Sequence, residues 1–383
     1  MRFLMLNWRD PKNPISGGAE RVTLAHLAAL VEHGHQVYWY TYDFPGGARE
    51  EIFQDIKIVR GGGKVSSIFK AIAWYRRQEK FDLVIDQHHG LPWFAPWWCK
   101  TNCVAYIHEV LGPIWSAFYP WPVSTIGRWQ EGWIHWLYRH VPFWTPSEST
   151  KKDLGAHGIR DVTVIANGID TVPLPALEEK PLQSPLRLIC VSRIEPNKRV
   201  DHAIRTLKLL TERNVPAQLK IVGDGESKTG LEQLTKNLGL TNCVHFTGWL
   251  SESAKNAALR KAHFLIHTSL REGWGLNVIE ANAMGTPAAV YPVGGLVDST
   301  VPGQTGLVTS AETPGSLADA LAEIVKNPEV YSRYRINAWE RSKTFSWPTI
   351  LPQMIAWLED HARMGEGYVK GEGVEKDNGN RQR

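Results

Sequence analysis

The sequence predicts an α/β protein built from two similar halves, each containing a mostly parallel sheet. Strand-like apolar runs alternate with helical patterns, and this alternation restarts near residue 186. In addition, 383 residues exceed what one hydrophobic core usually serves. A hydrophobic content of 43% and a charged content of 21% are ordinary for a globular protein.

The first half begins with a short apolar strand at residues 3–6, followed by a helical pattern from about residue 19 to a stop at Gly34. Further strands are predicted at residues 37–40, 56–59, 83–85 and 104–107. Because strands and helices alternate, these segments are expected to form βαβ units and hence a parallel sheet.

The second half begins with a buried strand at residues 186–191 and a helix whose apolar face runs from Val200 to Leu210. Its other strands are predicted at residues 219–222, 244–246 and 264–267, and a further helix ends at Gly285. Four prolines in residues 171–185 indicate a linker between the halves. The last helical pattern covers residues 348–361, and the polar, glycine-rich residues after it predict disorder. The predicted parts are a first domain at 1–172, a linker at 173–185, a second domain at 186–343, a final helix at 344–362 and a disordered tail at 363–383.

Composition and charge exclude several classes of protein. No run approaches about 18 uninterrupted apolar residues, and the N-terminus lacks the apolar core of a signal peptide. The four cysteines are irregularly spaced, which favours reduced thiols in a cytosolic protein. A net charge of +4 is too small to indicate a nucleic-acid partner. We therefore expect a cytoplasmic protein that does not bind nucleic acid.

Two glutamates eight positions apart, Glu272 and Glu280, flank the predicted start of a helix. Glu272 is expected in the loop before this helix, and Glu280 about one turn inside it. The first N–H groups of a helix have no partner within it and are suited to binding an anion. Carboxylates beside an anion site are good acceptors for sugar hydroxyl groups. The segment therefore predicts a nucleotide-sugar pocket.

Arg193 and Lys198 follow the first strand of the second half, where ligands bind in parallel sheets. The planar fork of an arginine and the point charge of a lysine, five positions apart, suit a diphosphate. The alternative is a solvated loop with two exposed cations. Together with the two glutamates, the pair predicts a phosphate-binding role.

Gly17 and Gly18 precede the first helix of the other half, where glycine lets backbone N–H groups approach a ligand closely. Two glycines before a helix can also be only a turn. The segment lacks the GxGxxG spacing, so a dinucleotide site is not indicated. Residues 60–65 do not form a P-loop, because Ile58 and Val65 stand where Gly and Ser or Thr are required.

Two histidine segments end predicted strands of the first half. His108, followed by Glu109, is expected to face the space between the halves and to exchange hydrogen bonds with a sugar hydroxyl. The alternative is a histidine satisfied by backbone at a strand end, and His88 and His89 carry the same ambiguity. No carboxylate or cysteine stands at ligand spacing to either segment, so a metal site is not predicted.

Tryptophan is concentrated in the first half, where nine of 17 fall between Trp93 and Trp144. Residues that recur there at helical spacing are Ile126, Trp129, Trp133, Trp136 or Leu137, and His140. Such an aromatic face packs in a core, contacts a membrane, or serves as a platform for sugar rings or a lipid tail. All three interpretations stay open.

These residues together resemble the retaining glycosyltransferases of family 4, which have the GT-B fold. The strongest element is the E-x7-E motif at Glu272 and Glu280. The resemblance extends from Gly17 to the helix near Trp357. Other matching segments are 145–147, 165–170, 192–198, 222–225, 246–249 and 345–347. It implies two Rossmann-like, doubly wound domains that face a cleft, with a C-terminal helix that crosses back to the first domain.

The resemblance also implies roles for the matching residues. Arg193 and Lys198 would bind the donor diphosphate, while Glu272 and Glu280 would contact the transferred sugar and the ribose. The residues expected in catalysis are His108, Arg193, Lys198 and Glu272. Those expected at the donor are Gly17, Gly18, Gly223, Trp249, Gly273, Trp274, Gly275, Leu276 and Glu280. Those expected on the acceptor side are His88, His89, Glu109 and Trp115. Trp274 replaces the family's common Phe, and Glu109 its frequent Asp.

The expected activity is transfer of a hexosyl unit, with retention and without metal or cofactor, from a UDP-sugar, GDP-mannose or similar donor. The acceptor is a hydroxyl of a saccharide or lipid-linked molecule, in polysaccharide, glycolipid or glycan assembly. One alternative is a nucleotide-sugar 2-epimerase of similar fold, although the Trp-rich first half suits a bulky acceptor that an epimerase lacks. The other is a non-catalytic sugar-nucleotide binding subunit, against which the complete set of site residues argues. The Trp-rich half also raises peripheral contact with the inner face of a membrane.

Overall fold

The computed structural model describes residues 1–64 and 66–364. Of the tail predicted at 363–383, residues 365–383 lie outside this description. Arg363, which was predicted to begin the tail, is instead the last residue of the final helix, α13 (Trp347–Arg363).

The apolar run at the N-terminus forms β1 (Arg2–Leu6), an inner strand of an eight-stranded sheet with the order β3-β4-β2-β1-β5-β6-β7-β8. Neighbouring strands pair in parallel except β3 and β4, which form an antiparallel pair at one edge. The other strands are β2 (Gln36–Thr41), β3 (Glu50–Phe53), β4 (Ile56–Arg60), β5 (Leu83–His88), β6 (Asn102–Ile107), β7 (Phe143–Thr145) and β8 (Val162–Val164).

A second sheet holds six strands, all parallel, in the order β11-β10-β9-β12-β13-β14. Its strands are β9 (Leu186–Val191), β10 (Ala217–Val222), β11 (Val244–Gly248), β12 (Phe264–His267), β13 (Ala288–Val290) and β14 (Gly306–Val308). The two sheets therefore form two Rossmann-like domains, as the sequence predicted.

The strand order reverses once in each sheet, between β1 and β5 in the first and between β9 and β12 in the second. Ligands of open parallel sheets bind beyond the carboxyl ends of the strands at such a reversal. Lys198 and Glu272 follow β9 and β12, whereas Arg9 and His89 follow β1 and β5. The topology therefore brings chemistry-bearing residues to the reversal point of each domain.

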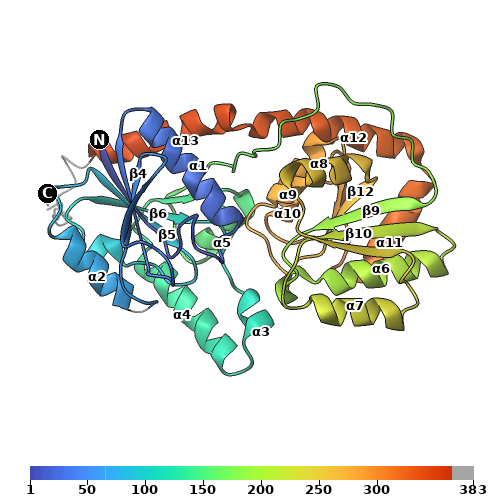
Figure 1. Cartoon of the computed structure of the whole chain (residues 1–383), viewed down its shortest axis with the longest axis horizontal. Helices are drawn as coiled ribbons and strands as arrows, with labels where there is room; N and C mark the ends of the chain where they lie inside the picture. Colours follow the sequence, from blue (N-terminus) through green and yellow to red (C-terminus); the bar gives the residue numbers. More distant parts are fainter. Residues whose placement is uncertain (65, 365–383) are drawn as a thin grey trace, which may run out of the picture.

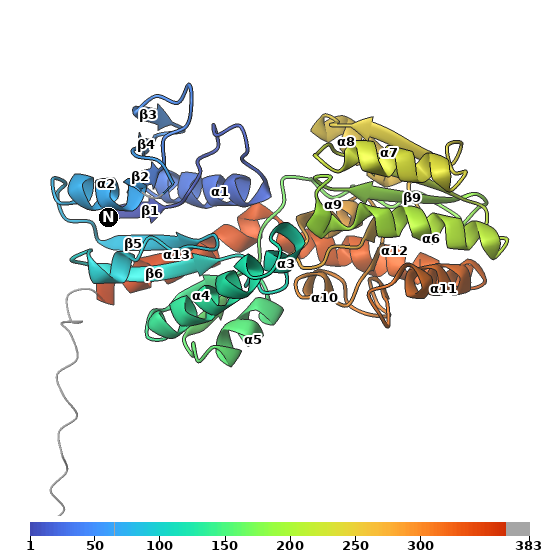
Figure 2. The ribbon, with the colours of Figure 1, turned by 90° about the horizontal axis from the view of Figure 1, so that it is seen from below.

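Helices cover both faces of each sheet (Figure 1, Figure 2). Those of the first domain are α1 (Gly18–Glu32), α2 (Ser66–Tyr75), η1 (Ala95–Trp97), α3 (Ile114–Phe118), α4 (Val123–Leu137) and α5 (Glu148–Ala156). Those after it are η2 (Pro196–Lys198), α6 (Val200–Glu212), α7 (Lys228–Asn237), α8 (Glu252–Lys261), α9 (Leu276–Ala283), α10 (Leu296–Ser299), α11 (Pro314–Val325), α12 (Pro328–Ser342) and η3 (Lys343–Phe345). None of the helices described between residues 1 and 364 has the length and apolarity needed to cross a bilayer.

The final helix belongs to the first domain although it follows the second in sequence. Met354 and Leu358 of α13 are fully buried in one cluster with Leu27 of α1 and Phe3 of β1. Figure 1 shows α13 reaching from the second domain across the first. The predicted crossing of the C-terminal helix is confirmed.

The chain passes between the domains twice, and the two crossings lie side by side. The N–H of Ile169 donates to the carbonyl oxygen of Phe345 at 3.0 Å, and the indole N–H of Trp347 donates to Asp170 at 2.7 Å. A Cβ on Gly168 would lie 2.3 Å from the Trp347 ring, so only glycine fits there.

The segment predicted as a linker, residues 173–185, is held against the second domain. The carbonyl oxygen of Leu174 accepts from the Trp339 indole at 2.9 Å, and that of Glu178 accepts from Arg335 at 2.9 Å. Lys180 donates to the carbonyl oxygen of Ala262 at 2.7 Å. This segment is therefore part of the second domain's surface and not a loose tether.

Candidate active site

Lys198 and Glu272 meet at the strand reversal of the second domain. The Lys198 Nζ lies 2.7 Å from Glu272 Oε2, and the same oxygen accepts from Ser269 Oγ at 3.3 Å. Lys198 is placed by the η2 turn after β9, and Glu272 by the loop after β12. The structure thus joins two residues that the sequence separates by 74 positions.

The charges of this pair stabilise each other. Burial raises the pKa of the Glu272 carboxyl, but Lys198, together with His267 and Ser269, outweighs burial and holds that pKa below its ordinary value. Burial likewise lowers the pKa of Lys198, and Glu272 reverses the effect, so the Lys198 pKa lies above its ordinary value. Both groups are therefore ionised at neutral pH.

Residues of the first domain reach this pair directly. A Cβ on Gly273 would lie 2.6 Å from the carbonyl oxygen of His108, so the two domains touch here, backbone to backbone. The His108 ring accepts from the Gln87 amide at 3.1 Å, and burial lowers the His108 pKa to about 4. The His108 imidazole is therefore neutral at neutral pH, while its backbone lies against Gly273.

The Glu109 carboxyl lies in surroundings that disfavour its ionised form. Its Oε2 is buried and has no hydrogen-bond partner among the described residues. Burial, with a smaller contribution from the nearby Glu272 charge, raises the Glu109 pKa to about 7 against the opposing effects of Lys198 and Arg271. Because this carboxyl sits beside the Lys198–Glu272 pair, it can change charge where a substrate would bind.

Glu280 lies on the second turn of α9 and is paired with a residue that the sequence did not single out. Lys255 of α8 is only 8% exposed, and its Nζ lies 2.9 Å from Glu280 and 2.7 Å from Glu252. Glu252 also contacts Arg21 of the first domain at 3.3 Å. An ionic chain therefore runs from α1 of the first domain to Glu280.

Two glycines of the predicted donor site are required by geometry. A Cβ on Gly223 would lie 1.9 Å from the Ser192 carbonyl oxygen, so the ends of β9 and β10 can approach only with glycine at 223. Gly275, with φ +87°, turns the chain into α9 in a conformation that side chains disfavour. Trp274 beside it is buried against Phe345, with ring centroids 5.2 Å apart, while Leu276 begins α9.

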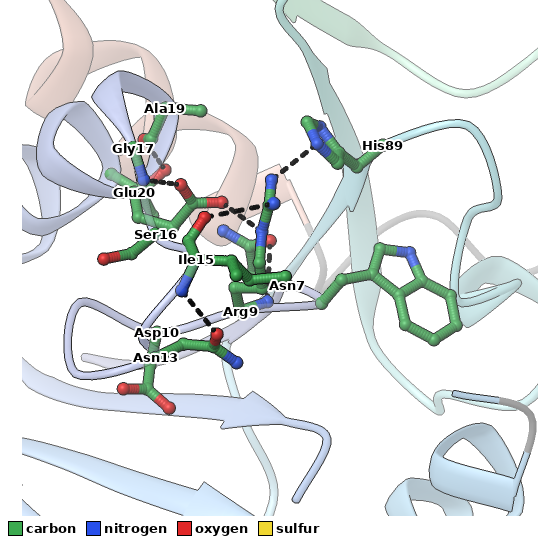
Figure 3. Close-up of polar contacts among 12 residues, drawn as sticks. Asn7, Arg9, Asp10, Asn13, Ile15, Ser16, Gly17, Ala19, Glu20 and His89 are labelled. Atoms are coloured by element: carbon green, nitrogen blue, oxygen red, sulfur yellow. Dashed lines mark hydrogen bonds and ion pairs between the residues drawn. The ribbon is translucent and has the colours of Figure 1, made fainter. Parts of the chain in front are cut away.

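The loop between β1 and α1 brings Gly17 to the strand reversal of the first domain, near Arg9 and His89 (Figure 3). The Gly17 N–H donates to Glu20 at 2.7 Å, and Glu20 also accepts from Arg9 at 2.9 Å. Arg9 in turn lies 2.7 Å from His89. Gly18 faces the second domain, because a Cβ there would lie 3.4 Å from the Leu276 side chain.

Neither Arg193 nor Trp249 bonds the Lys198–Glu272 pair, although Arg193 is near enough for its charge to lower the pKa of Lys198. Arg193 is half-exposed and bonds Glu195 at 2.8 Å, and Trp249 is 68% exposed after β11. Their expected donor contacts stay predictions.

The structure corrects the expectation for His88. Strand β5 extends to His88, three residues beyond its predicted end, and all its side chains are buried. The His88 ring packs edge-on against Tyr138 at 4.5 Å and against Phe143 at 5.3 Å. His88 is thus a core residue and does not face an acceptor.

Trp115 also has a packing role that the sequence did not indicate. A Cβ on Gly127 would lie 2.4 Å from the Trp115 ring, so this indole lies flat on α4. The ring therefore fixes α3 against α4, and any contact with an acceptor stays a prediction.

Further contacts between the domains were missed by sequence reasoning. Arg271 forms an ion pair with Asp153, and Ser149 of α5 bonds both Asp298 and the Gly295 N–H, the latter at 2.8 Å. Each of these residues resembles an ordinary solvated polar residue in the sequence. Only the arrangement of the two domains pairs them.

The arrangement offers a cation, hydroxyl acceptors and the N-terminus of α9 at one strand reversal, with the backbone of His108 from the other domain against Gly273. Such a set can orient a sugar and stabilise negative charge on a leaving diphosphate. Within residues 1–64 and 66–364, no three or more His, Cys, Asp or Glu side chains gather in a way that could hold a metal ion. Metal independence stays a prediction.

Comparisons with known protein families match both domains. Residues 16–172 match the model of Glycosyltransferase Family 4, and residues 178–341 match that of Glycosyl transferases group 1. The chain is 29% identical over 258 residues to a glycogen synthase of Mycobacterium tuberculosis, covering 61% of this chain and 62% of that protein. It is 28% identical over 176 residues to a D-inositol 3-phosphate glycosyltransferase of Corynebacterium glutamicum, covering 44% and 42%. The chain thus spans less than two thirds of the length of these relatives.

Solved structures share the fold over nearly the whole chain. Sucrose-phosphate synthase from Thermosynechococcus elongatus superposes with a TM-score of 0.76 at 19% identity, covering 94% of this chain and 98% of that one. Anabaena HepE in complex with UDP-glucose superposes with a TM-score of 0.71 at 19% identity, covering 94% and 100%. The two parallel-sheet domains are those of GT-B glycosyltransferases.

Proposed function

Since the chain belongs to the family 4 glycosyltransferases and has their GT-B fold, we propose that it transfers a hexosyl unit from a nucleotide-diphosphate sugar to a hydroxyl group, retaining the anomeric configuration without metal or cofactor. The observation that carries the proposal is the Lys198–Glu272 pair at the strand reversal, next to Gly273, which touches the backbone of His108 in the other domain. A UDP-sugar is the first donor to test, because the similar HepE structure holds UDP-glucose. GDP-mannose is the second.

The donor binds mainly to the second domain and the acceptor mainly to the first, and closure excludes water and aligns the acceptor hydroxyl. Glu272 accepts hydrogen bonds from the transferred sugar, and Glu280 from the ribose. Lys198, Arg193 and the N-terminus of α9 stabilise charge on the leaving diphosphate.

The bond changes occur at one carbon. The acceptor oxygen forms a bond to the anomeric carbon on the face from which the diphosphate leaves, and the bond from that carbon to the diphosphate oxygen breaks. The acceptor's proton leaves with the diphosphate. Because negative charge develops on the leaving diphosphate, Lys198 must stay protonated throughout the reaction. The Glu272 carboxylate favours this because it raises the pKa of Lys198.

The acceptor is proposed to be a saccharide or a lipid-linked molecule used in polysaccharide, glycolipid or glycan assembly. A lipid-linked acceptor is presented at a membrane surface, so the proposal includes a cytoplasmic protein that contacts the inner face of a membrane through its Trp-rich first domain.

A thermal-shift panel of UDP, GDP, ADP and their sugars tests the donor site. A ligand present at about 100 times its Kd adds about 2.7 kcal/mol to the free energy of unfolding. A flat response to every nucleotide contradicts the proposal. Glu280→Ala should remove the response, while Gly315→Ala, at a position with only one neighbouring atom within 4 Å of the new Cβ, should retain it.

Product analysis then separates transfer from epimerisation. A transferase releases the nucleoside diphosphate only as a new glycosidic bond forms. An epimerase instead yields the C2-inverted nucleotide sugar without an acceptor, and that result would replace the proposal.

A further inference from the structure

The α3–α4 hairpin exposes eight large apolar side chains, here together called the aromatic face. Its members are Phe118, Tyr119, Trp121, Val123, Ile126, Trp129, Trp133 and Trp136. Trp121 is 81% exposed and Trp129 72%. Large apolar side chains gathered at this exposure mark a binding surface and not a core.

The face has the length and pattern of a helix that lies on a surface. Ile126, Trp129, Trp133 and Trp136 recur every three or four residues, so they share one side of α4. From Val123 to Trp136 the face extends about 20 Å along the helix. That length exceeds one or two sugar rings and suits an interfacial helix.

The hairpin itself contributes few charged side chains. Within residues 110–147 the single acid is Glu131, and it is buried, with its oxygens accepting from the N–H groups of Leu111 at 2.6 Å and Gly112 at 2.8 Å. Arg128 is exposed beside the tryptophans, and the Arg139 guanidinium lies 4.3 Å from the Trp136 ring centre. A hairpin that exposes tryptophans and arginines while its one acid is buried is complementary to anionic lipid headgroups.

The hairpin is rigidly built and lies near the candidate active site. The Trp115 ring fixes α3 on Gly127 of α4, and α3 lies next to the η2 turn that carries Lys198. Figure 1 shows the hairpin projecting from the first domain beside the second. Whatever binds to the aromatic face on α4 is therefore held close to Lys198.

We propose that the aromatic face docks on an anionic lipid bilayer, with Trp129, Trp133 and Trp136 in the headgroup region. Docking holds the reversal points of both domains at the bilayer, where the hydroxyl of a lipid-linked saccharide can enter while its lipid stays in the membrane. This consequence for the acceptor rests on the proposed glycosyltransferase function, whereas bilayer docking itself does not.

The test is flotation of the full chain with vesicles, without donor or acceptor. Vesicles of phosphatidylglycerol and phosphatidylcholine should bind the protein, pure phosphatidylcholine should bind it less, and salt should weaken binding. The double variant Trp129→Ser/Trp133→Ser should lower the partition coefficient at least about tenfold, or about 1.4 kcal/mol. Equal partition of wild type and double variant overturns the proposal.

A matched pair of substitutions controls for general effects of a new charge. Ile126 of α4 is 58% exposed and Ile336 of α12 is 52% exposed. Ile126→Asp should abolish binding to anionic vesicles, whereas Ile336→Asp should bind as wild type does. Equal loss in both variants overturns the proposal.

Two further measurements separate the possible failures. The double variant should keep the thermal shift produced by nucleotides. If wild type ignores vesicles but self-associates in sedimentation, and the double variant does not, the aromatic face joins copies of the chain and the bilayer proposal is wrong. If wild type binds vesicles but no nucleotide, docking stands and the proposed function fails.

Discussion

Gly273→Ala tests whether the contact between the two domains belongs to the reacting enzyme. The new Cβ would lie 2.6 Å from the carbonyl oxygen of His108, across the domain boundary. Gly273 has no unusual backbone requirement, since its φ lies outside the left-handed region. The substitution therefore acts on the approach of the domains and not on the loop itself.

The size of the effect follows from that distance. Because Cβ atoms essentially never come closer than 3.0 Å to another heavy atom and ordinary contact begins at 3.4 Å, the domains must separate by about 0.4–0.8 Å. A misplacement of about 1 Å at a reacting centre costs about 10²-fold in rate. We expect kcat to fall about 10–100-fold. Stability should change by less than about 1 kcal/mol, because replacing glycine also restricts the unfolded chain.

Steady-state transfer kinetics and nucleotide binding check this prediction together. Nucleotide affinity should stay within about threefold of wild type, because the donor binds mainly to the second domain. Gly230→Ala, at a helical position with nothing within 4 Å of the new Cβ, is the matched control and should keep wild-type kcat. A kcat of Gly273→Ala within threefold of wild type would refute the reasoning.

Three other predictions address charged residues of the site. Lys198→Ala should lower kcat about 10²–10³-fold, the scale for losing one preorganised donor, and single-turnover kinetics showing less than a threefold loss would sink the assignment. Lys255→Met leaves Glu280 buried without its cation, so it should raise the KM for donor more than it lowers kcat. It should also cost about 3 kcal/mol of stability in urea melts, and Lys255→Arg should restore much of the lost affinity and stability. Because the Glu109 pKa is raised to about 7, ionising Glu109 disfavours the folded state, and stability should fall as pH rises from about 4.5 to about 7. Glu109→Gln should remove that fall, and identical pH profiles of Tm for variant and wild type would contradict the buried position of Glu109.

Much of the fold could be predicted from periodicity. The strands at residues 186–191 and 264–267 coincide with β9 and β12. Strands β3, β7, β8, β13 and β14 were not predicted, because three or four residues carry too little periodic pattern to separate them from a loop. The error at His88 has a similar origin, since a strand buried on both faces shows no alternation by which to locate its end.

The candidate site was only partly predictable. Lys198 and Glu272 stand at strand ends in the sequence, and a parallel sheet brings such ends together. Lys255 was missed because a lysine in a charged helix is ordinarily solvated, and only the packing of α8 against α9 buries it. The tryptophans do not all have one role. Trp93 and Trp144 are fully buried and belong to the core, whereas Trp129 is largely exposed. A pattern of spacing shows which residues share a helix face but not what covers that face.

The paired crossings of the chain at Gly168 and Trp347 determine how the two domains can move. Two segments that pass together through one place would act as a single pivot for any opening of the domains, and such an opening would break the ion pair of Arg271 with Asp153. The length of residues 173–185 does not set this motion, because that segment is bound to the second domain. Extra residues inserted there should be tolerated, whereas one methyl group at Gly168 would reset the angle at which donor and acceptor meet.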